Sequence, residues 1–206
     1  MKYLSISVLL VLFSCANKET VALPKSDTTI VKTIEDHSPI YIFFKVNGKD
    51  TLADVNRKNS IISTNWVFTI DKRLPLRLVI PEVIKLQEKK RNEKAHQNEE
   101  AQNYYSYADS IGKNLAFLPF TKVFYKMEKP KRTEVIFFDK NNQIWVENLM
   151  IKKDKLKNFL EELANKNITN YSFSFSADLS YECYVQDKIF LLNLNIKSQV
   201  YEEYMY

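Results

Sequence analysis

The order of hydrophobic patterns over residues 133–201 restricts the fold more than any other feature of this chain. A β-rich run at 135–138 precedes Lys140-Asn141-Asn142, and a second such run occupies 143–146. Asparagine tolerates positive φ and is common in tight turns. The pattern therefore predicts two strands joined by a short turn.

The periodicity then alternates between that of a helix and that of a strand. Apolar residues recur at i, i+3, i+4 and i+7 within 156–163, aromatic and small residues alternate over 171–177, and helical spacing returns over 181–193. Residues 196–201 complete the series as a last strand. The sequence therefore predicts a ββαβαβ module over residues 133–206.

Three stretches of this module resemble the periplasmic domain of the ExbD/TolR family: NNQIWVEN, DKLKNFLEEL and FSADLSYECYVQDKIFLLNLNI. The last places Ala177, Asp178, Tyr181 and Val185 where the family pattern has an Ala-Asp pair, a helix-start Tyr and a following Val. The resemblance implies homodimerisation and binding of partner segments or cell-wall polymer.

The chain also departs from that family. Family members carry a membrane helix with an acidic residue that takes part in proton movement, and residues 1–33 supply no such helix. Asn142 and Asn148 replace the two turn glycines of the pattern. Proton transduction is therefore not expected of this chain.

The N-terminus carries Lys2, a short apolar run from Leu4 to Phe13, and then Ser14-Cys15. The run is too short to cross a bilayer, which takes about 20 apolar residues. Leu12-Phe13-Ser14-Cys15 resembles the lipobox of bacterial lipoproteins, although Phe13 departs from the usual residue. The resemblance implies a signal peptide over 1–14 and an acylated Cys15. The alternative is a buried cysteine at the end of an N-terminal helix.

The composition excludes several kinds of site. The 206 residues include only two glycines, so Gly-rich phosphate loops are not expected. With Cys15 acylated, Cys183 remains as the single thiol, which leaves no disulfide and no cysteine metal cluster. The net charge of +5 fits a surface rich in lysine. We expect no cofactor, no metal and no nucleic-acid partner.

The region before the module is predicted to be less regular. Residues 15–37 suggest a lipidated polar tether, and 38–81 a β-rich segment with a hairpin turning at Asn47-Gly48 and extended segments at 60–70 and 74–80. Residues 82–109 favour an exposed polar helix, which belongs to a helical connector and linker over 82–132. The expected class is α+β, and no internal repeat is evident.

Few residues point to catalysis. His37 and His96 are the only histidines and are expected to be exposed. Adjacent pairs such as Glu161-Glu162 point their side chains apart, so they make poor acid–base pairs. No catalytic residue is predicted. Asp178 and Tyr181 are the predicted partner-binding residues, with a helix cap as the other role open to Asp178.

The sequence therefore predicts a lipid-anchored lipoprotein of the bacterial cell envelope, facing the periplasm or the cell surface. Its expected role is a non-catalytic binding or assembly module in a transport or cell-wall complex. Its expected partners are membrane lipid through Cys15 and an envelope protein or cell-wall polymer. The alternative is an envelope hydrolase with an unrecognised carboxylate site. An exposed sheet edge near 171–201 would favour binding, and a pocket with converging carboxylates would favour the hydrolase.

Overall fold

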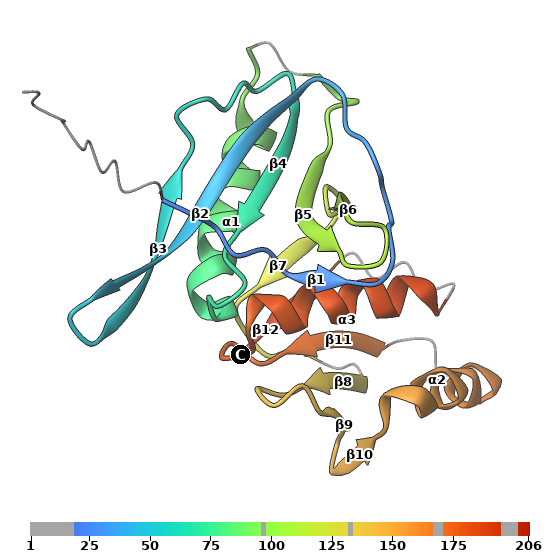
Figure 1. Ribbon diagram of the computed structural model, residues 1–206. Coiled ribbons are helices and arrows are strands. Elements are labelled where there is room, and N and C mark those ends of the chain that lie inside the picture. The colour runs from blue at the N-terminus through green and yellow to red at the C-terminus, as the bar shows by residue number, and fades with distance from the viewer. Residues whose placement is uncertain (1–18, 96–97, 132–133, 167–170, 195–201) are drawn as a thin grey trace, which may run out of the picture.

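The computed structural model describes residues 19–95, 98–131, 134–166, 171–194 and 202–206 (Figure 1). Within these ranges, twelve strands form two mixed sheets, accompanied by three α-helices and one 3-10 helix, η1 (Lys153–Lys155). This content is consistent with the predicted α+β class. Cys15, His96 and the predicted strand at 196–201 lie outside the described residues. None of the described helices is long and apolar enough to span a bilayer.

The first sheet lies in the upper half of Figure 1 and has the order β1-β5-β4-β2-β3, with β6 paired to β5. Strands β2, β4 and β5 are parallel to one another, whereas β3 and β6 are antiparallel to their neighbours. The strands are β1 (Lys25–Ser26), β2 (His37–Asn47), β3 (Asp50–Asn56), β4 (Asn65–Ile70), β5 (Asn103–Asp109) and β6 (Asn114–Pro119).

The second sheet lies below the first and has the order β10-β9-β8-β11-β12-β7. Its strands are β7 (Phe124–Lys126), β8 (Glu134–Phe138), β9 (Ile144–Val146), β10 (Leu149–Ile151), β11 (Tyr171–Phe175) and β12 (Glu202–Met205). Helices α2 (Leu156–Asn165) and α3 (Tyr181–Asn193) connect the parallel strands. The described elements from β8 to α3 follow the predicted order, with β10 as an addition, and the last described strand is β12 instead of the predicted 196–201.

The predicted hairpin is confirmed, but its turn lies one residue later than expected. The turn residues are Gly48 and Lys49, and Gly48 has φ of +63°. Glycine at the first central position is typical of a type II′ turn. The pairing of β2 with β4 ends at Ile42, whereas its pairing with β3 continues to Asn47. The end of the hairpin therefore projects beyond the sheet (Figure 1).

The predicted extended segment at 74–80 is wrong, and of the described residues in the predicted exposed helix at 82–109 only 82–92 are helical. Helix α1 spans Leu76–Asn92 and begins directly after Pro75. Its apolar side chains recur at helical spacing and are buried, so α1 is a core helix. The buried apolar residues are Leu76, Val79, Ile80, Val83 and Leu86.

Residues 103–109 form strand β5 instead of the end of a helix. The rings of Tyr105 and Tyr107 are fully buried, and β5 pairs with both β4 and β6. Pairing on both sides and burial of two aromatic rings outweigh the helical propensity of the preceding residues.

The predicted polar tether is packed on the domain from residue 19 on. Strand β1 pairs with β5, and Val31 forms an antiparallel bridge with Phe117 of β6. The N–H of Ile30 donates to the hydroxyl of Tyr107 at 2.9 Å. Ile34 is buried in a small apolar cluster with Phe117. A few apolar residues among polar ones therefore fix this segment to the first sheet.

The two sheets contain the same arrangement of elements. In each half a strand leads into a core helix and on to a parallel strand, as β4-α1-β5 and β11-α3-β12. Beside β4 and β11 lie the hairpin strands β2 and β8, with Ile42 paired to Ile70 in one half and Phe138 paired to Phe175 in the other. Strands β3 and β9 therefore correspond. The chain is an internal structural repeat that its sequence does not reveal.

Candidate functional site

The two halves meet where β4 leads into α1 and β11 leads into α3. Pro75 and Ser180 form an antiparallel bridge at this junction. The N–H of Arg77 donates to the carbonyl of Ala177 at 2.7 Å, and the N–H of Glu182 donates to the carbonyl of Lys72 at 3.2 Å. These bonds are related by the repeat, so the junction has local two-fold character. Both predicted partner-binding residues lie beside it.

Asp178 lies at the surface of the junction. Its Oδ1 accepts from Nε of Arg77 at 2.8 Å, which links the second half of the chain to the first. The cap of α3 is Ser180, whose Oγ accepts from the N–H of Cys183 at 3.3 Å. The cap role considered for Asp178 is therefore wrong, and its described interaction is an exposed ion pair.

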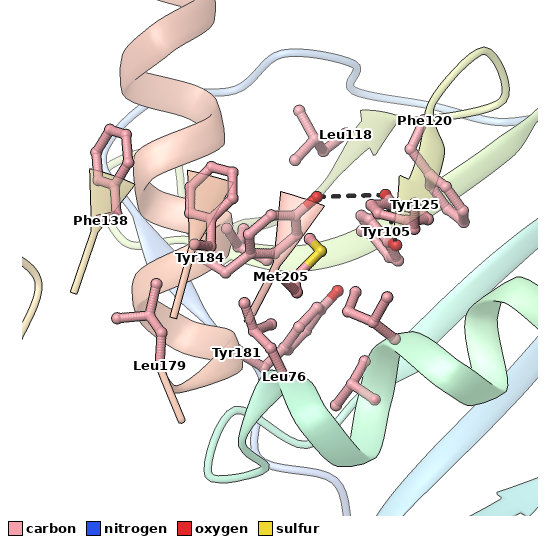
Figure 2. Packing of buried hydrophobic residues seen from close by; sticks show 14 of the residues in the cluster. Leu76, Tyr105, Leu118, Phe120, Tyr125, Phe138, Leu179, Tyr181, Tyr184 and Met205 are labelled. Atoms are coloured by element: carbon pink, nitrogen blue, oxygen red, sulfur yellow. Dashed lines mark hydrogen bonds between the residues drawn. The ribbon is translucent and has the colours of Figure 1, made fainter. Parts of the chain in front are cut away.

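Tyr181 lies inside the core and has no exposed surface. Its ring packs edge-on against Tyr105, with the ring centroids 5.6 Å apart, and Figure 2 shows it among the buried side chains of both halves. Within the described part of the chain its hydroxyl has no hydrogen-bond partner. Burial raises the pKa of this phenol well above its ordinary value. Tyr181 is therefore inaccessible to a partner in this structure.

A chain of buried hydroxyl groups crosses from one half to the other (Figure 2). The hydroxyls of Tyr105 and Tyr125 lie 2.8 Å apart, and those of Tyr125 and Tyr184 lie 3.2 Å apart. The Tyr184 hydroxyl also lies 2.7 Å from Oε2 of Glu203, and Nζ of Lys188 donates to Oε1 of the same carboxylate. Glu203 is only 1% exposed. The network satisfies a buried carboxylate and fixes the register of β12 against α3.

A second buried carboxylate, Asp187, lies on α3 facing the turn between β8 and β9. Nζ of Lys153 lies 2.5 Å from its Oδ1. With the amide nitrogen of Asn142 turned to the carboxylate, that nitrogen lies 2.6 Å from Oδ2. Burial raises the pKa of Asp187 to about 6, although Lys153 and Asn142 oppose the shift. Asn142 has φ of +61°, which confirms the expected use of asparagine in this turn.

Lys90 is a buried cation near the end of α1, only 8% exposed. Its Nζ donates to the carbonyl of Thr64 at 3.0 Å and to Oδ1 of Asn103 at 3.1 Å, and it lies 5.0 Å from the Trp66 ring centroid. Burial lowers the pKa of this amine to about 8. Each of these contacts is to a neutral group. Through them, Lys90 connects α1 to the starts of β4 and β5.

These ionisable groups are occupied by internal partners, and among the described residues they form no catalytic constellation with His37. His37 is exposed at the start of β2. Across the described ranges, no three His, Cys, Asp or Glu side chains are placed to hold a metal ion. A depression of about 450 Å³ between β1 and α3 contains a single acid, Asp27, and is otherwise lined by neutral residues and Lys25. Converging carboxylates of the predicted hydrolase type are not seen at this depression.

An exposed sheet edge near 171–201 would favour binding, but β11 does not form one, because it lies between β8 and β12. Strand β3 does form an edge, and in the described structure it pairs only with β2. The sequence predicted this strand but gave it no role. Its alternating pattern was the available signal, since Thr51, Ala53 and Val55 alternate with Asp50, Leu52 and Asp54.

The ladder defines which backbone groups of β3 are open. The carbonyl of Ile42 accepts from the N–H of Asp71 at 3.0 Å and so points away from β3. Ile42 and Val55 are therefore a non-hydrogen-bonded pair, and the backbone groups of Val55 point outward. The side alternates along the strand, so those of Thr51 and Ala53 also point outward. Three residues of β3 thus present donors and acceptors at the edge.

The projecting end of the hairpin also exposes apolar side chains. Val46 is 65% exposed and Leu52 is 44% exposed, on opposite faces of the ribbon. Nζ of Lys45, next to them, forms ion pairs with Asp54 at 2.6 Å and with Glu19 at 2.8 Å. The ion pair with Glu19 places the start of the described chain beside the hairpin.

Protein-family models, curated proteins and solved structures contain no match to this chain. The resemblances to bacterial lipoproteins and to the ExbD/TolR family therefore remain predictions from the sequence. The candidate functional site rests on geometry, and the geometry singles out the β2–β3 hairpin with its open edge.

Proposed function

We propose that this protein is a lipid-anchored lipoprotein of the bacterial cell envelope that acts as a non-catalytic binding or assembly module. The observation that carries the proposal is the β2–β3 hairpin, which projects from the first sheet and leaves the edge of β3 unpaired in the described structure. Open edges of this kind are templates for a further strand and are usually covered or shortened when they have no partner.

The anchor rests on Cys15 and on its distance from the folded domain along the chain. Only residues 16–18 separate Cys15 from Glu19, whose carboxylate already contacts Lys45. An acyl group on Cys15 would thus hold the hairpin close to the bilayer. Several acyl chains make such attachment stable, since each buried CH₂ contributes about 0.8 kcal/mol.

The resemblance of residues 133–206 to the periplasmic domain of the ExbD/TolR family is part of the same proposal. The element order β8-β9-α2-β11-α3-β12 is the order that the resemblance implies, with β10 added. Such a module without its membrane helix would keep partner binding and lose proton transduction. An envelope transport complex or a cell-wall complex is the setting in which it would work.

The test is to purify the full chain from a bacterial envelope beside a Cys15→Ala variant. Mass spectrometry of the N-terminal peptide should show an acylated Cys15 and no residues 1–14. The variant should leave the membrane fraction while keeping the same thermal unfolding transition. An unmodified Cys15 in membrane-free protein would refute the anchor.

Binding is tested on the same material by chemical cross-linking before solubilisation. The expected result is a defined envelope component cross-linked to the wild-type chain and lost, or strongly reduced, in Cys15→Ala. Wild-type protein that is acylated yet cross-links to nothing would refute the binding role.

A further inference from the structure

The internal repeat shows what a strand bound at the β3 edge would look like. Strand β9 of the second half corresponds to β3, since Phe138 pairs with Ile144 as Ile42 pairs with Val55. On its outer side β9 carries β10, which runs antiparallel to it and pairs Ile151 with Ile144. In the described structure β3 has no such neighbour. The described part of the chain therefore fills in one half the position that it leaves open in the other.

The two faces of β3 differ in their chemistry. Thr51, Ala53 and Val55 point to the core side, and both Ala53 and Val55 pack against the core. Asp50, Leu52 and Asp54 point to the opposite side. A strand placed beside β3 would continue these faces, because directly opposed residues of neighbouring strands share a face.

We propose that the β3 edge binds an extended polypeptide segment of a partner protein, antiparallel to β3, in which aliphatic residues alternate with polar or basic ones. This inference rests on the binding role proposed above and names the partner's chemistry. The aliphatic residues would extend the core face beside Ala53 and Val55, and a basic residue would face the carboxylate of Asp50, since that of Asp54 already pairs with Lys45. The outward groups of Thr51, Ala53 and Val55 would supply the main-chain bonds.

Strand β10 provides the probe. A synthetic peptide with the sequence of residues 147–152, ENLMIK, carries Leu149 and Ile151 on one face and is capped at both ends to remove terminal charge. It is titrated into isotope-labelled protein that starts at residue 15 and so contains every described residue. We expect amide shifts, and slowed hydrogen exchange, at Thr51, Ala53 and Val55.

Ala53→Pro is the discriminating variant, because proline removes the outward N–H and leaves the bonds between β3 and β2 intact. The peptide should bind at least about tenfold more weakly to it. Ala53→Val enlarges the side chain but keeps the N–H, so it should bind as wild type does. Equal binding to Ala53→Pro and Ala53→Val would overturn the proposal.

If Ala53→Pro fails to fold, the hydrogen-exchange measurement on wild-type protein still tests the proposal. Saturating peptide that leaves exchange at Thr51, Ala53 and Val55 unchanged, or that slows it only in the second sheet, also overturns the edge site. The experiment uses neither lipid nor envelope. Its failure is thus distinct from the failure of the anchor or of cross-linking in the envelope.

Discussion

Leu76 and Tyr181 begin the two core helices, and each donates a backbone hydrogen bond to the loop that precedes the other helix. The N–H of Leu76 donates to the carbonyl of Leu179 at 3.0 Å, and the N–H of Tyr181 donates to that of Leu74 at 2.8 Å. Each helix start is thus satisfied by the loop that precedes the other helix. We expect the two halves to unfold together, because neither helix start keeps these partners alone.

The cap of α3 is a first test of this junction. Ser180→Ala removes the side chain that accepts from the N–H of Cys183, and should lower the free energy of unfolding by about 1 kcal/mol. Ser180→Asp retains an acceptor and should lose much less. Urea unfolding measures both variants, with far-UV and near-UV circular dichroism followed together. Separate transitions for the two signals would contradict cooperative unfolding of the halves.

Removing either partner alone from the ion pair of Lys188 and Glu203 should lower the stability of the protein. Lys188→Met leaves the Glu203 carboxylate without its cation in the core and should lower the free energy of unfolding by about 3 kcal/mol. Lys188→Met combined with Glu203→Gln should cost less than the sum of the two single changes. Chemical denaturation of the four proteins forms the cycle. Additive losses would show that the pair is not coupled.

Asp187 should make the protein less stable as pH rises. Its folded pKa of about 6 lies above the ordinary value of 3.8, so the unfolded chain ionises first. Stability from this group is complete below about pH 4 and is lost by about pH 6. Asp187→Asn should gain up to about 3 kcal/mol relative to wild type across that window. Parallel stability curves for the two proteins between those limits would contradict the assignment.

Lys90 should make the protein more stable as pH rises through the alkaline range. Its folded pKa of about 8 lies below the ordinary value of 10.5, so the folded state loses its proton first as pH rises. Stability should therefore rise from about pH 8 upward relative to Lys90→Met, by at most about 3 kcal/mol. Thermal unfolding at pH 7.5 and 9.5 compares the two proteins. A difference that does not change with pH would mean that Lys90 stays charged in the fold.

The second half of the fold could be predicted because its signals are local. Alternation in 171–175 and one apolar face in 156–163 reflect contacts that each element makes along its whole length. Helix α1 was not predicted as a core helix, because Pro75 and Pro81 suggested extended edge segments. Strand β5 was missed because the polar residues before it have helical propensity, and only pairing to β4 and β6 decides its state.

The candidate site was harder to predict because a strand is an edge only in relation to the strands that lie beside it. The edge of β3 is open because no other strand of the described residues lies beside it. The repeat that explains the edge leaves almost no trace in the sequence. Between 70–87 and 175–192 only three aligned positions are identical: Leu74 with Leu179, Ile84 with Ile189, and Leu86 with Leu191.

The docked N-terminal segment has a consequence for how far the domain can reach. From Cys15 to Glu19 an extended chain covers only about 14 Å, and beyond Glu19 the segment is fixed to the first sheet. An acylated Cys15 would therefore be a short anchor. It would leave the domain little freedom to move away from the bilayer or to rotate. A folded body of this size is about 40 Å across. Any partner would have to approach within that height above the bilayer, and the hairpin would meet it at a nearly constant angle.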